Sequence, residues 1–186
     1  ALVLGLCAGV GLVFVIDLLN NTFRAQAQLE ELSGQSYIGA IPYVGRRMHR
    51  KDVIAQFKEN PKSALAEAVR SLRTSILFSR VDNPPKTVMF TSSVPREGKS
   101  TTSMLVAMTS RQMGKSAIIV DCDLRLPSLA QLLPEDDGEA GLLSVLEGTA
   151  KLEDAIYRDK DTGLDVLMTR PSEPRSSVNA ADILAS

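Results

Sequence analysis

The segment that most constrains the fold is residues 87–102, TVMFTSSVPREGKSTT. Three apolar residues at 88–90 lead into a short loop that ends in Gly98-Lys99-Ser100. Apolar residues then recur at helical spacing from Met104 to Met108. A strand, a tight loop and a helix in this order predict a phosphate-binding loop. A helix start leaves backbone N–H groups unpaired and carries the positive end of the helix dipole, so an anion is favoured there.

Two side chains at the end of this loop add to the prediction. Lys99 can reach the β- and γ-phosphates of a nucleotide, and the Ser100 hydroxyl can hold Mg²⁺. The pattern G-x-x-x-x-G-K-[S/T] departs at its first position, where this chain has Ser93. An ordinary glycine-containing loop between a strand and a helix is the alternative. We interpret the segment as a nucleotide site.

A second polar group follows the apolar run at residues 116–120, SAIIV, which predicts a strand buried on both faces. Asp121 and Asp123 come directly after it, with Arg125 two residues further on. Ligands of open α/β sheets bind beyond the carboxyl ends of the strands. The two carboxylates are therefore placed for Mg²⁺ and for proton abstraction. Turn capping, or a salt bridge to Arg125, is the alternative interpretation.

The remaining pattern predicts how these motifs are connected. Residues 63–79 have the periodicity of an amphipathic helix, and Gly114 is expected to end the helix after the phosphate loop. Short helices are expected at 126–133 and 141–146, a strand at 164–169, and a further helix from 178 to 186. This alternation predicts an α/β fold with a parallel sheet flanked by helices.

On the helix at 63–79, Glu67, Arg70 and Arg73 are spaced at i, i+3 and i+6. At ~100° per residue they span about 120° of one side. A solvated face on which Glu67 pairs with Arg70 is one interpretation. A subunit interface, where the Arg side chains meet carboxylates or phosphate of a neighbour, is the other.

The N-terminal residues 1–16, ALVLGLCAGVGLVFVI, contain no charge, and with Leu18 and Leu19 they approach the ~20 residues that cross a bilayer. We expect a transmembrane helix over residues 1–20, with a buried core helix as the alternative. The Lys and Arg residues that follow predict that the rest of the chain is cytoplasmic.

A juxtamembrane linker is expected over residues 21–61. Its first part, 22–32, is helix-permissive and should stop at Ser33-Gly34, and residues 37–42 should be extended. The basic residues at 46–51 either contact anionic lipid headgroups or form a solvated loop, and the sequence leaves both open.

The composition excludes several classes of protein. A net charge of −1 argues against nucleic-acid binding, which needs a clustered positive surface. The single histidine, His49, has no ligand partners nearby, which argues against zinc chemistry. Cys7 and Cys122 lie far apart and are expected to be small buried residues rather than a disulfide or metal pair.

Together, the two motifs resemble those of a known protein family. PREGKSTT followed by IIVDCDLRLPSL resembles the Walker A and Walker A′ motifs of the bacterial tyrosine kinases of polysaccharide export, within the MinD/ParA-like ATPase group. The segment AEAVRSLRTSI resembles the E-x-x-R-x-x-R oligomerisation motif of that family. The N-terminal span with YIGAIP resembles the second transmembrane helix and linker of chain-length determinant proteins, also called polysaccharide co-polymerases.

The resemblance implies ATP and Mg²⁺ as cofactors. It implies that Lys99 binds the β/γ-phosphates, that Ser100 and Asp123 hold Mg²⁺, and that Asp121 takes the proton of a tyrosine hydroxyl. Lys99, Asp121 and Asp123 are the implied catalytic residues. The implied nucleotide-binding residues are Pro95, Arg96, Glu97, Gly98, Lys99, Ser100, Thr101 and Arg125.

The function implied by the resemblance is that of a protein-tyrosine autokinase anchored in the bacterial inner membrane. It would form a homo-oligomeric ring through Glu67, Arg70 and Arg73, and it would regulate exopolysaccharide chain length, polymerisation and export. The kinase domain is expected over 62–186 and incomplete at its C-terminal end, with a Walker B strand and a tyrosine-rich tail beyond. One alternative is a MinD/ParA-like positioning ATPase, although Val94 stands where that group has its signature lysine. Another is a co-polymerase scaffold without kinase activity.

Overall fold

The computed structural model of the chain describes residues 5, 9–15, 26–45, 48–130, 132–133, 138 and 140–170. By its internal contacts the chain divides into two units, Ala1–Ile38 and Gly39–Ser186. Among the described residues, no helix is both long enough and apolar enough to cross a membrane. Much of the predicted span, residues 1–4, 6–8 and 16–20, lies outside the described residues. The transmembrane helix therefore stays a prediction.

In the first unit, helix α2 spans Gln26–Ser33 and ends where the sequence predicted. Gly34 has a φ of 66°, a left-handed conformation that favours glycine, and its N–H donates to the Glu30 carbonyl at 2.9 Å. The chain then leaves the helix without regular structure, and the Tyr37 N–H donates to the Glu30 carboxylate at 2.7 Å. A side chain of α2 thus fixes the start of the segment that follows it.

The second unit begins with a helix that the sequence analysis did not predict, α3, Arg50–Glu59. The His49 N–H donates to the Asp52 carboxylate at 3.1 Å, which satisfies a backbone donor at the helix start. Ile54 and Phe57 are buried in the hydrophobic core. Because the helix contributes only these two buried residues, its apolar periodicity is too short to identify from the sequence. Residues assigned to the linker therefore belong, in the structure, to the packed core.

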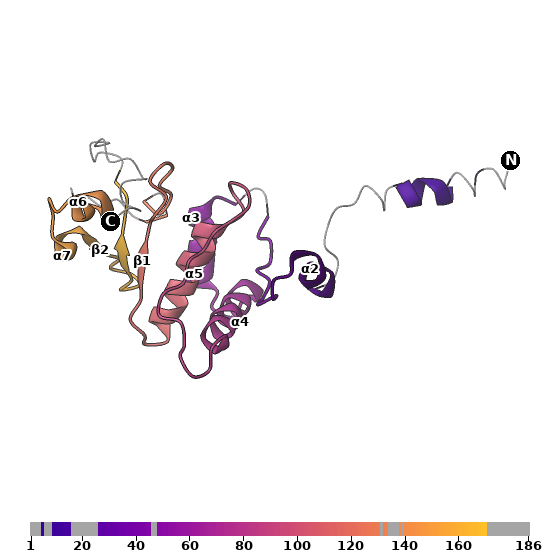
Figure 1. Cartoon of the computed structure of the whole chain (residues 1–186), viewed down its shortest axis with the longest axis horizontal. Coiled ribbons are helices and arrows are strands. Elements are labelled where there is room, and N and C mark those ends of the chain that lie inside the picture. The colour runs from indigo at the N-terminus through magenta and orange to yellow at the C-terminus, as the bar shows by residue number, and fades with distance from the viewer. Residues whose placement is uncertain are drawn as a thin grey trace. The chain divides into compact units, whose positions relative to one another are not determined.

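Helices α4, Ala64–Phe78, and α5, Lys99–Gln112, have the positions that the sequence predicted. The Ser63 hydroxyl caps α4 by accepting a hydrogen bond from the Ala66 N–H at 3.2 Å. The two helices pack against each other, and α3 packs against α5 as well (Figure 1). Their buried side chains form most of the helical part of the core: Leu65, Ala66, Val69, Met104, Leu105 and Met108.

Arg73 does not share the exposed side of α4 with Glu67 and Arg70. Its side chain is only 7% exposed, and its Nε donates to Ser110 Oγ of α5 at 3.0 Å. The reason is geometric, since Arg73 follows the fully buried Val69 by four residues, about 40° round the helix. The residue predicted at the edge of an exposed surface is therefore a link between α4 and α5.

Within the part of the chain that the structure describes, the sheet has three strands in the order β1-β3-β2: β1, Ile118–Val120, β2, Ile156–Arg158, and β3, Asp165–Leu167. The predicted parallel pair is confirmed, with Ile119 opposite Val166. Strand β2 was not predicted and runs antiparallel to β3 through a short connection that contains Gly163, at a φ of 64°. Helix α5 packs against β1 on one side of the sheet.

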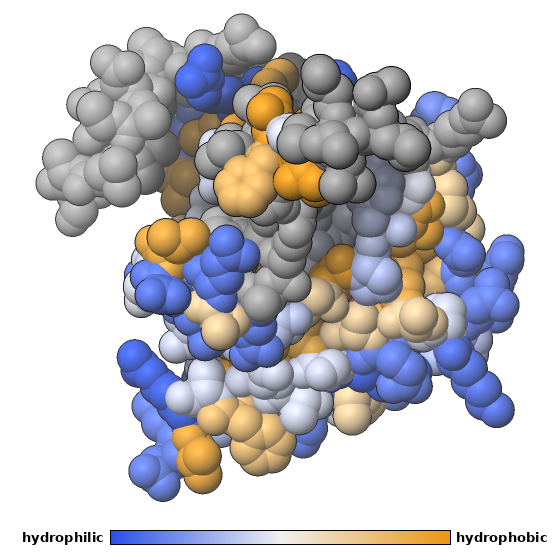
Figure 2. Space-filling model, turned by 90° about the vertical axis from the view of Figure 1, so that its right-hand side faces the viewer, coloured by the Kyte–Doolittle hydropathy of each residue, from blue (hydrophilic) through white to orange (hydrophobic). Residues whose placement is uncertain are grey.

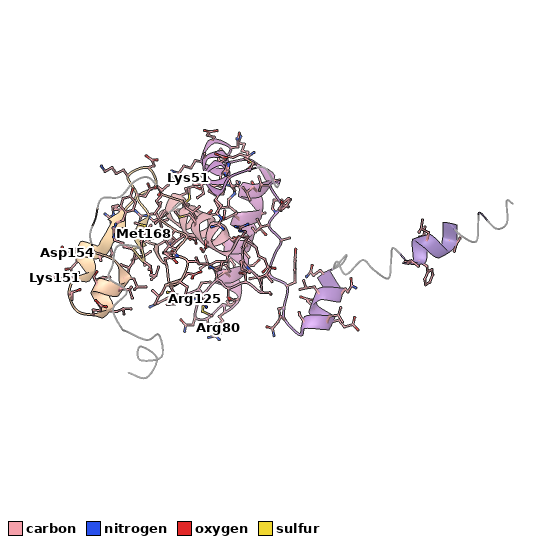
Figure 3. The ribbon with its side chains drawn as sticks, turned by 90° about the horizontal axis from the view of Figure 1, so that it is seen from above. Lys51, Arg80, Arg125, Lys151, Asp154 and Met168 are labelled. Atoms are coloured by element: carbon pink, nitrogen blue, oxygen red, sulfur yellow. The ribbon has the colours of Figure 1, made fainter. Side chains whose placement is uncertain are left out.

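Two further short helices, α6, Leu142–Leu146, and α7, Leu152–Ala155, belong to this unit. Helix α6 is the one predicted at 141–146, and the Leu142 N–H donates to the Met168 carbonyl just after β3 at 2.8 Å. Seen from above, Met168 lies between helices α3 to α5 on one side and helix α7 on the other (Figure 3). The labels Lys151 and Asp154 mark α7. Strands are thus flanked by helices, as expected of an α/β fold.

Three other expectations differ from the structure. Residues 87–91 form no strand, because no described strand pairs with their backbone, and Val88 and Met89 are exposed. Among residues 126–133, those that are described form turns instead of a helix, and Leu129, Leu132 and Leu133 still reach the core. In β1 only Ile119 is buried, so the strand is covered on one face by the described residues. The helix expected at 178–186 lies outside the described residues.

Cys122 is exposed, although burial was expected. It stands between Asp121 and Asp123 in extended chain, where successive side chains point to opposite sides. Asp121 is buried and Asp123 is half-buried, so the side chain between them faces solvent. Cys7 lies outside the described residues.

Apolar and hydrophilic side chains are mixed on one face of the molecule (Figure 2), so exposed apolar residues are not confined to the loop around Cys122.

The packing of α3 leads to a test with a matched pair of substitutions. Phe57 is 2% exposed and Phe78, at the end of α4, is 68% exposed. Phe57→Ala should lower the free energy of unfolding by about 3–5 kcal/mol, because it leaves a cavity in the core. Phe78→Ala should change it by less than about 0.5 kcal/mol. Urea unfolding of both variants measures the difference, and similar losses would show that α3 is not part of the core.

Candidate functional site

The predicted phosphate loop leads directly into α5. Gly98, at the N-cap of α5, has a φ of 93°, which a side chain would disfavour. The first helical hydrogen bond runs from the Thr102 N–H to the Gly98 carbonyl at 2.8 Å. The N–H groups of Lys99, Ser100 and Thr101 precede this bond, so they are available to an anion at the positive end of the helix dipole.

Glu97 holds the loop together from within. Its carboxylate accepts hydrogen bonds from the N–H groups of Ser93 and Val94, at 2.9 and 3.3 Å. Ser93, the residue that departs from the phosphate-loop pattern, thus contributes its backbone to closing the loop. Arg96 lies between these residues with a φ of 70°, a strained conformation for a residue with a side chain. Glu97, predicted to contact the nucleotide, bonds the loop's own backbone in this structure.

Lys99 forms an ion pair with Asp123 across the site. Its Nζ donates to Asp123 Oδ2 at 3.0 Å, and both side chains are 34% exposed. The hydrogen bond from Lys99 is the main reason that the pKa of Asp123 lies below its ordinary value of 3.8. The N–H groups of Leu126 and Arg125 lower this pKa further, and burial opposes them. The lysine and one carboxylate from the two predicted motifs therefore meet.

Asp121 is buried at the end of β1, with 5% of its surface exposed. Oδ1 accepts from the Asp123 N–H at 3.1 Å, and Oδ2 accepts from the N–H groups of Ser128 and Leu129, both at 3.0 Å. The carboxylate thereby joins the two ends of the loop that follows β1. This geometry corresponds to the turn-capping alternative, and the role of a proton acceptor stays a prediction.

Ser128 was missed by the sequence analysis, and the structure places it at the centre of the site. Its hydroxyl donates to Ser100 Oγ at 2.7 Å. The chain offered no signal for this contact, because 28 residues separate the two serines and a single serine after Pro127 is unremarkable in a loop. The hydrogen bond from the Ser128 N–H to Asp121 Oδ2 and the burial of Leu129 in the core hold Ser128 at the start of α5.

The other predicted site residues lie at different distances from this cluster. Pro95, Arg96 and Arg125 are exposed in the two loops, and Figure 3 labels Arg125. Glu67 and Arg70 are on α4, where Arg70 donates to the Glu67 carboxylate at 2.6 Å and to the Pro61 carbonyl at 2.7 Å. The self-paired interpretation of these two residues is what the chain shows.

A surface pocket lined by Arg80, Asn83, Pro84, Pro85, Lys86 and Thr87 includes none of the predicted site residues.

The residues at the start of α5 fit a magnesium–nucleotide complex. Backbone N–H groups, Lys99 and the Ser100 hydroxyl come from the start of α5, and the loop after β1 adds the Asp123 carboxylate. Mg²⁺ usually takes one or two carboxylates and shares the nucleotide phosphates, so it needs no larger acidic cluster. No group of three possible protein ligands of the His, Cys, Asp and Glu type gathers among the described residues.

Comparison with known proteins decides the family. The chain matches no known family model. It is 39% identical over 142 residues to the tyrosine-protein kinase YwqD of Bacillus subtilis, which covers 76% of this chain and 56% of that protein. It is 30% identical to a putative tyrosine-protein kinase in the cps region of Klebsiella pneumoniae, over 98% of this chain and 26% of that protein.

A solved structure shows the same relationship. The kinase domain of the Escherichia coli tyrosine kinase ETK superposes with a TM-score of 0.67 at 30% identity, over 78% of this chain and 60% of that domain. The chain belongs to the bacterial tyrosine kinase family. As a family member it spans about half of YwqD and about a quarter of the Klebsiella protein.

The ion pair at this kinase-family site predicts a pH dependence of stability. The pKa of Asp123 is 3.8 in the unfolded chain and lower in the folded one, so its carboxylate favours the folded state above 3.8. That contribution is lost as the pH falls through the folded pKa. It should be at most about 1 kcal/mol, because the pair is partly solvated. The stability difference between wild type and Asp123→Asn should be constant above about pH 5 and shrink below it.

Urea unfolding at a series of pH values, with EDTA and without nucleotide, measures this difference. In a Lys99→Met background the same Asp123→Asn substitution should lose most of its pH dependence, because the main cause of the shift is gone. A difference that stays flat from neutral pH to pH 3 in the wild-type background would contradict the ion pair.

Proposed function

We propose that the protein transfers the γ-phosphoryl group of ATP to tyrosine residues and acts in exopolysaccharide export. The observation that carries this proposal is the meeting of Lys99, Ser100 and Asp123 at the N-terminus of α5, in a chain of the bacterial tyrosine kinase family. Phosphoryl transfer depends mainly on positioning and on charge stabilisation, and this cluster can supply both.

Each residue has a defined task in this proposal. Lys99 leaves Asp123 to neutralise the β- and γ-phosphates, and the N–H groups of residues 99–101 hold their oxygens. Ser100 and Asp123 would hold Mg²⁺, which screens the charge that develops on the phosphoryl oxygens. Release of Asp123 from Lys99 frees a carboxylate for the cation, so the two changes support each other.

Asp121 is the proposed acceptor of the tyrosine proton. Its carboxylate accepts three backbone hydrogen bonds, so it would have to exchange at least one of them for the tyrosine hydroxyl. The proposal therefore includes a rearrangement of the loop after β1 when a tyrosine enters. Asp121 also fixes Ser128 and Leu129, which couples any such rearrangement to the start of α5.

We also propose that the protein is anchored in the bacterial inner membrane, with the residues after about 20 in the cytoplasm. The uncharged residues 1–16 and the Lys and Arg residues that follow support this proposal. Recovery of the full-length protein in the soluble fraction after cell lysis would contradict it.

We propose that the homo-oligomer forms through α4, and that the protein also contacts the polysaccharide polymerisation and export machinery of the membrane. Glu67 and Arg70 are on the solvated side of α4, where a neighbouring subunit could replace their mutual ion pair. Arg73 would support this surface indirectly by tying α4 to Ser110 of α5. Light scattering of Arg70→Ala should show a smaller assembly than wild type, and an unchanged mass would exclude α4 as the interface.

The kinase activity has a direct test. With ATP and Mg²⁺, the full-length protein should gain phosphotyrosine, and Lys99→Ala should reduce the initial rate about 100-fold or more, because it removes the charge that binds the phosphates. Lys115→Ala, a matched substitution of an exposed lysine just after α5, should leave the rate unchanged. Anti-phosphotyrosine blots and mass spectrometry measure the product.

Two results of this experiment would favour other functions. Hydrolysis of ATP without phosphotyrosine would indicate a plain ATPase of the MinD/ParA-like type. A Lys99→Ala variant that still assembles and supports polymer of normal length would indicate a scaffold in which the nucleotide site does not drive export.

A further inference from the structure

Ser128 lies in a loop, but it is buried and its backbone is hydrogen-bonded. Only 8% of its surface is exposed, although the neighbouring Leu126 is largely exposed. Its N–H donates to Asp121 Oδ2 at 3.0 Å, and the adjacent Leu129 N–H donates to the same oxygen at 3.0 Å. The backbone at Ser128 is thus held by a buried charge, which makes stronger hydrogen bonds than a neutral acceptor does.

The anchor itself is fixed to the sheet. The Asp121 N–H donates to the Leu167 carbonyl of β3 at 2.9 Å, and the Thr169 hydroxyl donates to the Asp121 carbonyl at 2.8 Å. A continuous path of hydrogen bonds therefore runs from β3 through Asp121 to Ser128. It ends at Ser100 Oγ, which the Ser128 hydroxyl reaches at 2.7 Å.

A serine hydroxyl at the start of a helix can rotate about its Cα–Cβ bond, and only some orientations present its oxygen to a cation. Ser128 restricts that rotation, since it lies within hydrogen-bond distance of the Ser100 oxygen. A hydroxyl can both donate and accept. When the Ser100 oxygen faces a cation, its proton needs an acceptor, and Ser128 Oγ can reverse its role to provide one.

We propose that Ser128 is a positioning residue that orients the Ser100 hydroxyl toward a divalent cation. The inference rests on the proposed function, because it concerns the Mg²⁺ of the same site. It gives a role to Ser128, which is not one of the charged residues of the two sequence motifs. Outer partners of metal ligands act in this way, and their loss commonly weakens metal affinity about 10- to 100-fold.

The test is a titration of ADP binding with Mg²⁺ by isothermal calorimetry on the full-length protein. Ser128→Ala should raise the Mg²⁺ concentration at half-maximal enhancement of ADP binding about 10-fold. The affinity for ADP in EDTA should not change, because the lysine and the backbone N–H groups are untouched. Ser128→Thr keeps the hydroxyl and should restore the wild-type Mg²⁺ dependence.

Ser103→Ala is the matched control. Ser103 lies on the same turn of α5, and its hydroxyl donates to the Ser100 carbonyl at 3.0 Å instead of contacting the Ser100 hydroxyl. It should leave the Mg²⁺ dependence as in wild type. Thermal unfolding without ligand checks that each variant is folded. If Ser128→Ala does not fold, Ser128→Cys keeps the volume with a weak hydrogen-bonding group and should show the same Mg²⁺ shift.

The possible results separate this inference from the proposed function. Equal loss of ADP affinity with and without Mg²⁺ in Ser128→Ala would overturn the inference and leave Ser128 a structural residue. An unchanged Mg²⁺ dependence in that variant would overturn it as well. If wild-type protein shows no Mg²⁺-dependent ADP binding at all, the proposed function itself fails.

Discussion

Asp121 has its carboxylate buried at the carboxyl end of β1, where it accepts hydrogen bonds from three backbone N–H groups. Hydrogen bonds to a charged group each contribute about 1.5–3 kcal/mol, so this one side chain can hold the whole loop after β1. The loop in turn presents Asp123 to Lys99 and Ser128 to Ser100. The site is therefore an arrangement of two loops, one at the start of α5 and one after β1, with a buried charge as their common support.

Charge balance explains how such a site is stable without a bound nucleotide. Lys99 adds a positive charge at the N-terminus of α5, which is itself the positive end of the helix dipole. Without an anionic partner, this charge would be uncompensated. Asp123 supplies that partner, and the low pKa of its carboxyl group shows that the pair stabilises the ionised form. Because the pair is partly solvated, it contributes little to folding. It is therefore weak enough to be exchanged for phosphates, which carry more charge.

The sequence predicted the parts of this arrangement that depend on local pattern. Helix α4 follows from its apolar spacing and its Ser63 cap, and the start of α5 follows from Gly98-Lys99-Ser100. It did not predict α3, because Ile54 and Phe57 are too few to define a periodicity. Nor did it predict β2, because a strand of three residues is too short to show an alternating apolar pattern. Ser128 and the burial of Arg73 depend on contacts with α5, which no local pattern records.

The apolar run before the phosphate loop shows the opposite error. Its residues have the pattern of a strand, but a strand also needs a neighbour that accepts its hydrogen bonds, and none of the described strands pairs with it. The same distinction applies to Leu129, Leu132 and Leu133, whose helical spacing is met by turns that bring each side chain to the core. The spacing of these three leucines thus identified buried side chains without identifying their backbone, whereas Val88 and Met89 of the apolar run are exposed and were identified in neither respect.

A crystal structure of the full-length protein, or of its complex with partner subunits, with ADP and Mg²⁺ tests the proposed site most directly. The β-phosphate should lie against the N–H groups of residues 99–101, with Mg²⁺ beside Ser100 Oγ. Lys99 Nζ should contact the phosphate instead of Asp123. Nucleotide phosphates bound elsewhere, with the ion pair between Lys99 and Asp123 intact, would show that the start of α5 is not the nucleotide site.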